Sequence, residues 1–135
     1  MAEKELSTEE AKPWFIDLDW FHRNGRSVSP LLRGCLCAKC RQQLSAGEKE
    51  ASETELLTTI ADCCCHTPGF ITGQQPVLES IFRLFLANRN QPLSLEELGE
   101  QLSERRGGDA YRTLEEILLR LLKNDRYYGL RPAPD

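Results

Sequence analysis

The sequence predicts a mainly α-helical protein in two parts, and three observations support this. Apolar residues recur at spacings of three and four through most of the chain, which is the period of a helix packed on one face. Capping and turn residues separate these runs into short segments. All six cysteines lie in the first half of the 135 residues. We therefore divide the chain into a flexible segment (1–12), a cysteine-containing helical unit (13–73) and a second helical unit (74–135).

The composition is that of a soluble globular protein. Hydrophobic residues make up 40% and charged residues 28% of the chain, so a folded core is expected. The net charge of -4 gives no bulk attraction to nucleic acid or to an anionic membrane. No apolar run approaches the roughly 20 residues that span a bilayer, and the first residues lack the apolar core of a signal peptide. We expect a cytoplasmic protein with no membrane partner.

Short helices and polar connections are predicted for the first unit. Aromatic and apolar residues between Trp14 and Phe21 are spaced for a short helix, and Ser29–Arg33 resembles a second one. Residues 45–52 form a polar loop. From Glu53 an apolar face recurs at three and four as far as the second group of cysteines, and Thr67-Pro-Gly stops this helix.

The six cysteines form two groups with none between them. The first is Cys35-Leu-Cys37-Ala-Lys-Cys40 and the second is Cys63-Cys64-Cys65-His66. In a reducing cytosol, grouped cysteines hold a metal more often than they form disulfides. Three consecutive cysteines cannot all pair locally, because vicinal disulfides are strained. The grouping therefore predicts metal coordination.

Two ligands are assigned by spacing, and the other two come from the second group. Cys37 and Cys40 form a Cys-x-x-Cys turn that lets two thiolates approach one ion. Cys63 and Cys64 both continue the apolar face of their helix, whereas Cys63 and His66 form the alternative Cys-x-x-His pair; Cys65 is a further candidate. Tetrahedral zinc accepts either pair, and thiolates also suit an iron–sulfur cluster. We predict one structural Zn²⁺.

A run of basic residues surrounds the first cysteine group. No acidic residue occurs between Trp20 and Gly47. The basic residues in this stretch are Arg23, Arg26, Arg33, Lys39 and Arg41. Four thiolates around Zn²⁺ carry a net charge of about -2, which these side chains would offset. They could instead contact a phosphate backbone, so they are also the candidate nucleic-acid-binding residues.

Three helices and a strand are predicted for the second unit. An amphipathic helix begins near Val77 and ends near Asn88-Arg-Asn, and Gln91-Pro-Leu forms an extended connector. Ser94-Leu-Glu-Glu is a capping box that opens the second helix. Asp109 or Thr113 caps the third helix, and residues 127–130 form a short strand. Three helices plus short strands in this order are the winged-helix arrangement.

Specific motifs extend this interpretation. Through Gln91-Pro-Leu-Ser-Leu-Glu-Glu-Leu, Thr113 and Tyr128-Gly-Leu, residues 76–131 resemble the HARE-HTH type of winged helix. That type occurs in the delta subunit of RNA polymerase and in chromatin-associated proteins. The sequence departs from it in lacking a glycine-containing wing hairpin. The whole chain is also similar to an uncharacterised bacterial family that joins a Cys-x-x-Cys, a double cysteine and such a tail. This resemblance implies Cys63 and Cys64 as the second ligand pair.

These observations leave three classes of function. The first, which we adopt as the prediction, is a non-enzymatic zinc-binding winged-helix protein that assists transcription or contacts nucleic acid, with RNA polymerase or another transcription component as partner. The second is a protein–protein adapter with purely structural zinc. The third is an iron–sulfur or redox-sensing protein. We predict no enzyme and no small-molecule substrate, because nothing resembles a phosphate-binding glycine loop or an activated nucleophile.

Overall fold

The computed structural model describes residues 12–45 and 51–134. Within this part the chain is mainly α-helical, as predicted, with one two-stranded antiparallel sheet. All but the last residue of the predicted flexible segment, and most of the predicted polar loop, lie outside the described residues. The elements are β1 (Trp14–Ile16), α2 (Leu18–Arg23), α3 (Ser29–Arg33), α4 (Ala38–Ser45), α5 (Glu53–Asp62), the 3-10 helix η1 (Cys64–His66), α6 (Val77–Ala87), α7 (Leu95–Arg106), the 3-10 helix η2 (Asp109–Tyr111), α8 (Glu115–Asn124) and β2 (Leu130–Pro132).

The short helix predicted between Trp14 and Phe21 was wrong in its first part. Trp14–Ile16 is the strand β1, and helix α2 starts only at Leu18. Trp14 and Ile16 are buried while Phe15 between them is half-buried, so this segment follows the period of a strand. Asp17 separates the two elements, and its carboxylate accepts a hydrogen bond from the backbone N–H of Asp19 at 3.1 Å.

Strand β1 exists because distant segments supply its hydrogen-bond partners. It pairs antiparallel with β2, with Phe15 opposite Arg131, and Trp14 forms an isolated bridge with Leu93. The side-chain amide of Asn90 also accepts from the backbone N–H of Ile16 and donates to its carbonyl, both at 2.8 Å. These partners lie more than 70 residues away in sequence, which explains why local periodicity predicted a helix.

The helices around the cysteines agree more closely with the prediction. Helix α3 occupies the predicted segment, and α5 begins where predicted, with a capping box in which Ser52 and Glu55 bond each other's backbone. The predicted end of this helix was wrong, because α5 ends at Asp62 and the second cysteine group lies at its C-cap and in η1. The polar helix α4 was not predicted. Thr67 directly follows η1, in agreement with the predicted stop.

The second unit contains the three predicted helices. Ser94 and Glu97 form the expected capping box of α7. The start of the third helix was predicted wrongly: Leu114 is the N-cap residue of α8, without a side-chain cap, and Asp109 lies in η2. The predicted strand at 127–130 was also misplaced, because β2 begins at Leu130.

A buried carboxylate shapes the connection between α8 and β2. Asp125 is 2% exposed and accepts hydrogen bonds from the backbone N–H groups of Tyr127, Tyr128 and Leu130 at 2.9–3.0 Å. Gly129 has a φ of +68°, and a Cβ there would lie 2.6 Å from the ring of Phe21. Glycine is therefore required at this position, and residues 127–129 turn instead of extending β2.

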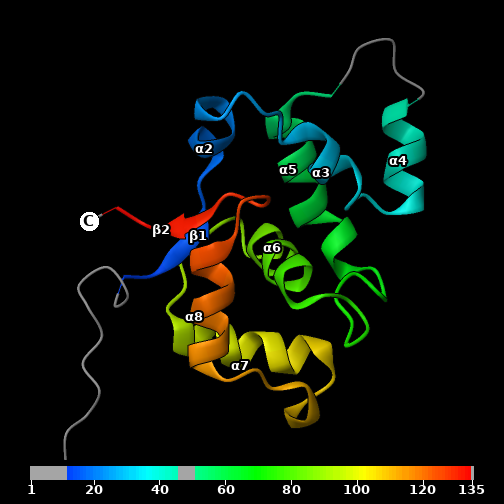
Figure 1. Cartoon of the computed structure of the whole chain (residues 1–135). Coiled ribbons are helices and arrows are strands. Elements are labelled where there is room, and N and C mark those ends of the chain that lie inside the picture. Colours follow the sequence, from blue (N-terminus) through cyan, green and yellow to red (C-terminus); the bar gives the residue numbers. More distant parts are fainter. Residues whose placement is uncertain (1–11, 46–50, 135) are drawn as a thin grey trace, which may run out of the picture.

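One hydrophobic cluster links the two predicted units. It runs from Trp14 and Ile16 through the helices to Leu130. Figure 1 shows α6 at the centre, with α3 and α5 on one side of it and α7 and α8 on the other, while α4 lies at the periphery. Strand β1, which pairs with β2 of the second unit, thus comes from the first unit. The division into two units and the winged-helix arrangement stay predictions.

Candidate metal centre

Two segments far apart in sequence bring the cysteines together. Cys37 directly precedes α4 and Cys40 lies in its first turn, whereas Cys63 is the C-cap residue of α5 and Cys64 opens η1. The chain changes from an α-helix to a tighter helix at Cys63, which has a φ of -130° and a ψ of -62°. This change of direction presents two adjacent cysteines to the α4 segment.

The sulfur atoms of three cysteines form a compact group. The Sγ atoms of Cys37, Cys40 and Cys63 all lie within 4.8 Å of one another. Four sulfur atoms at ~2.3 Å from a tetrahedral ion are separated by ~3.8 Å, so only small side-chain adjustments separate this group from a closed site. These three residues can therefore hold a metal ion.

Cys64 completes the thiol cluster. Its Sγ accepts a hydrogen bond from the backbone N–H of Cys37 at 3.2 Å. Backbone N–H donors of this kind stabilise negative charge on sulfur. The four thiols, Cys37, Cys40, Cys63 and Cys64, form what we call the cysteine cluster, and they are the chemistry that zinc prefers.

The environments of these thiols differ. The pKa of Cys37 is lowered to about 6, first by a hydrogen bond from the backbone of Cys40 and then by its thiol neighbours. Burial raises the pKa of Cys40 well above its usual range, and burial also raises the pKa of Cys64. Without metal, the first proton therefore leaves Cys37, while the buried members keep theirs. Metal binding must displace those remaining protons.

The other candidate ligands lie outside the cluster. The side chain of His66 is exposed at the end of η1. Cys65 is buried, and its thiol donates to the carbonyl of Ala61 at 3.2 Å. Cys35 is also buried, and burial raises its pKa to about 11. Both cysteines have the environment of small apolar residues.

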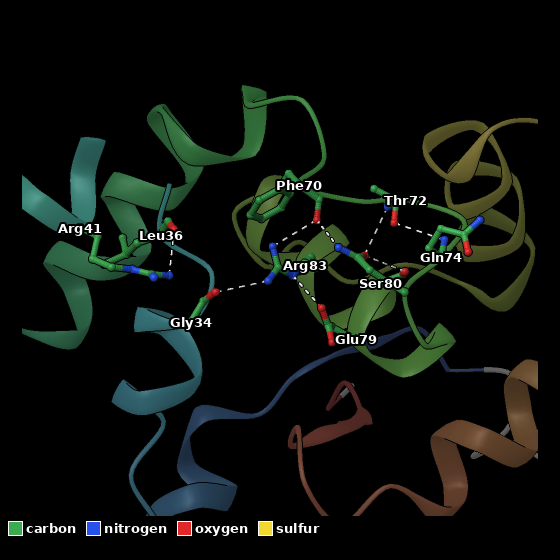
Figure 2. A network of polar contacts seen from close by, with 10 residues as sticks. Gly34, Leu36, Arg41, Phe70, Thr72, Gln74, Glu79, Ser80 and Arg83 are labelled. Carbon is green, nitrogen blue, oxygen red and sulfur yellow. Dashed lines mark hydrogen bonds and ion pairs between the residues drawn. The ribbon is translucent and has the colours of Figure 1, made fainter. Parts of the chain in front are cut away.

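A half-buried arginine that sequence reasoning missed supports the first cysteine segment. The guanidinium of Arg83 on α6 donates to the carbonyl of Gly34 at 3.3 Å and to that of Phe70 at 3.2 Å. It also lies 3.4 Å from the carboxylate of Glu79 and over the ring of Phe70 (Figure 2). Arg83 therefore fixes the loop before Cys35 against the central helix. The signal in the sequence was a lone arginine within the apolar run of α6.

The five predicted basic residues do not form one surface group. Arg23 pairs with Asp17 at 2.9 Å, although Asp17 lies just outside the acid-free stretch. Arg26 donates to the carbonyl of Arg126 and stacks on the rings of Trp20 and Tyr127. These two arginines are thus held in structural contacts.

The remaining basic residues lie next to the cysteine cluster in the chain. Arg33 ends α3, while Lys39 and Arg41 flank Cys40 on α4. Arg41 donates to the carbonyls of Arg33 and Leu36 at 3.4 and 3.3 Å, and Figure 2 shows the contact with Leu36. Lys39 is exposed and Arg33 is half-buried. Positive charge therefore concentrates where a four-thiolate site would carry negative charge.

Comparison with known proteins adds no relative. No family model matches the chain, no curated protein matches it, and no solved structure matches it. Among the helices described here, none has the length and apolar character needed to cross a membrane. The site must therefore be interpreted from its own geometry.

Proposed function

We propose that the chain is a non-enzymatic zinc-binding protein, in which one Zn²⁺ held by Cys37, Cys40, Cys63 and Cys64 joins α4 to the end of α5. The observation that carries this proposal is the group of three sulfur atoms within 4.8 Å, contributed by segments 23 residues or more apart, with Cys64 beside it. When bound, zinc would supply four strong bonds to sulfur and no reactive open position.

Cys64 is the preferred fourth ligand. It is fully buried and its sulfur already contacts the backbone of Cys37, whereas His66 is exposed. A closed four-cysteine site is typical of structural zinc, and catalytic zinc sites keep a position for water. This donor set favours a structural role, and it equally suits iron. An absorption spectrum distinguishes the two, because iron–sulfur clusters are coloured and zinc thiolates are not.

In this proposal, the protein is a transcription-associated accessory factor that contacts nucleic acid weakly, and the metal stabilises its fold. The support is the positive charge of Arg33, Lys39 and Arg41 on the short α3–α4 segment that zinc would fix in place. Helix α8 is not basic on one face, since Glu115 and Glu116 accompany Arg120 and Lys123. Contact with phosphate would therefore come from the metal-proximal surface and not from α8.

Salt-dependent retention on heparin and binding to a DNA duplex test this proposal. Non-specific binding no tighter than roughly micromolar is expected at physiological salt. The double variant Arg33→Ala and Lys39→Ala should weaken it, because it removes two positive charges close to the cysteine cluster in the chain, one exposed and one half-buried. The charge-matched control, Arg112→Ala with Arg120→Ala, should change it little.

Two results would redirect the proposal. Tight sequence-specific binding that depends on α8 would make the protein a conventional DNA-reading regulator. If the protein binds no nucleic acid, the protein–protein adapter would replace the accessory factor as the proposed function. A specific observation favours that second candidate, namely that Leu114 and Ile117 are exposed on α8.

A further inference from the structure

Two of the six cysteines are more accessible to solvent than the other four. Cys37 and Cys63 are half-buried and pack against the hydrophobic cluster. The other four are buried members of that cluster, namely Cys35, Cys40, Cys64 and Cys65. The susceptibility of a thiol to oxidation depends on its exposure as well as on its chemistry. A small oxidant dissolved in water therefore reaches Cys37 and Cys63 first.

The same two cysteines bring together segments that are distant in sequence. Cys37 directly precedes α4, and Cys63 is the C-cap residue of α5. Their Sγ atoms lie within 4.8 Å of each other. A disulfide bond requires ~2.05 Å between the two sulfurs, and each Sγ moves by rotation about its own Cα–Cβ bond. Rotation of the two side chains is therefore the movement that brings the sulfurs into contact.

Other pairings within the cysteine cluster are less favourable. Cys63 and Cys64 are adjacent, and vicinal disulfides are strained. Cys64 does not belong to the group of three sulfurs, and it is completely buried. Pairings with Cys40 use a thiol that is 5% exposed and packed in the core. A Cys37–Cys63 disulfide also closes a far longer loop than a Cys37–Cys40 disulfide, which restricts the unfolded chain more strongly.

We propose that Cys37 and Cys63 form an oxidation site, at which hydrogen peroxide converts the two zinc-bound thiolates into a disulfide and releases the metal. This inference rests on the proposed function, because it takes the cysteine cluster to hold zinc. Loss of two thiolates leaves too few ligands for a tetrahedral site. The disulfide connects the same two segments, α4 and the end of α5, that zinc would join. Oxidation therefore removes zinc and keeps this connection, whereas chelation of the reduced chain removes both.

The reaction balances with hydrogen peroxide as the oxidant. One thiolate sulfur attacks a peroxide oxygen, the O–O bond breaks, and the departing hydroxide takes up a proton to become water. The second thiolate attacks the sulfur of the sulfenic acid so formed. The S–S bond forms, the S–O bond breaks, and the second hydroxide also leaves as water after taking up a proton. The two sulfurs lose two electrons, and the peroxide gains them.

Oxidation of the zinc-loaded full chain tests the site. Metal analysis before oxidation tests the proposed function by itself. Hydrogen peroxide is then added while a chromogenic chelator records zinc release, with a sample lacking peroxide as the reference, and peptides are mapped without reduction. Trypsin cleaves after Lys39, so Cys37 and Cys40 fall in different peptides, and fragmentation distinguishes Cys63 from its two neighbours. We expect about one zinc released for each Cys37–Cys63 disulfide, and rebinding of zinc after reduction with dithiothreitol.

Cys35→Ser is the matched control, because Cys35 shares the tryptic peptide of Cys37 but lies outside the cluster. Its zinc release and its disulfide should equal those of the native chain. Hydrogen exchange provides the second readout. The oxidised chain should keep its protection from α3 to η1, whereas the reduced and chelated chain should lose it at least tenfold.

The outcomes separate this inference from the zinc proposal. Absence of zinc before oxidation would contradict the proposed function and with it the zinc release, while the peptides would still identify the cysteines that pair. A zinc-loaded chain whose main disulfide joins another pair, or that releases zinc without forming a disulfide, would overturn the inference and leave the zinc proposal intact. The same holds if oxidation abolishes the protection as completely as chelation does.

Discussion

The two halves of the molecule build helices in different ways. Before residue 74, α2, α3 and α4 have six, five and eight residues, and the cysteines lie at the end of α5 and the start of α4. After it, α6 and α7 have 11 and 12 residues and contribute much of the buried apolar surface. Helices of five to eight residues do not persist alone. Both halves contribute to one hydrophobic cluster. The comparison indicates that the short helices of the first half need a constraint in addition to this packing, which the cysteine cluster can provide, whereas the longer helices of the second half rely on packing alone.

Removing a ligand from the cluster should give the largest effect. Structural zinc supplies roughly 10–16 kcal/mol in small zinc peptides, comparable with the whole stability of a typical domain. Cys37→Ser or Cys40→Ser should therefore unfold the segment from α3 to η1. Hydrogen exchange should show that protection is lost there and kept in α6 and α7.

Cys35→Ser is the matched control for this comparison. Cys35 belongs to the same group in sequence but lies outside the cluster, so the variant should cost only about 1 kcal/mol. If Cys35→Ser proved more damaging than Cys37→Ser, the ligand assignment would be incorrect.

Two variants within the first half test which residue is the fourth zinc ligand. Cys64→Ser should lower zinc affinity by at least tenfold, because a hydroxyl is a poor replacement for thiolate on zinc. His66→Ala should leave the affinity unchanged, since its side chain is exposed. Competition with a chromogenic chelator measures both. Equal zinc binding by Cys64→Ser and native protein, together with a loss in His66→Ala, would assign the histidine instead.

A substitution in the second half should destabilise the protein without changing zinc affinity. Asp125→Ala removes the acceptor for three backbone N–H groups. Buried donors left without a partner cost about 1–3 kcal/mol each, and partial access to water reduces the sum to an expected loss of about 3 kcal/mol. Urea denaturation measures it.

Asp109→Ala, at an exposed residue of η2, provides the control and should change stability by less than about 0.5 kcal/mol. A zinc affinity that fell in parallel with stability in Asp125→Ala would show that the two halves do not differ as described.

The smallest expected effect is a difference in thiol reactivity between Cys37 in the cysteine cluster and Cys35 outside it. Immediately after chelation at pH 7, while the segment from α3 to η1 is still folded, iodoacetamide should modify Cys37 first, because its pKa of about 6 leaves most of the thiol ionised. The rate at Cys37 should rise as pH approaches 6 from below and then level off. Cys35, with a pKa of about 11, should react slowly and still accelerate at pH 10. Peptide mass spectrometry identifies the sites, and preferential labelling of Cys35 would contradict these environments.

Sequence reasoning predicted the features of the fold that depend on contacts between residues close together in the chain. The capping box at Ser94 and the apolar periodicity of α6 predicted their helices, because side chains within one turn make these contacts. The two cysteine groups predicted where a metal-binding cluster would lie for a similar reason, since reducing conditions and spacing limit what such groups can do.

The features that were missed depend on distant partners. Residues 14–16 become a strand only because β2, Leu93 and Asn90 bond to them. Helix α4 has little apolar periodicity, so its sequence did not identify it. The contact between Cys64 and the backbone of Cys37 depends on how two separate segments pack. The support that Arg83 gives to the cysteine segment is likewise a property of the folded chain.

The metal content of the full chain, purified without chelator, tests the central claim most directly. Elemental analysis combined with a protein concentration from amino-acid analysis should give about one zinc per chain and no iron. Substitution of Cys37 and Cys40 together should reduce the zinc to background, since two of the four ligands are lost. Protein that is folded without bound metal, or that contains iron with inorganic sulfide, would contradict the account.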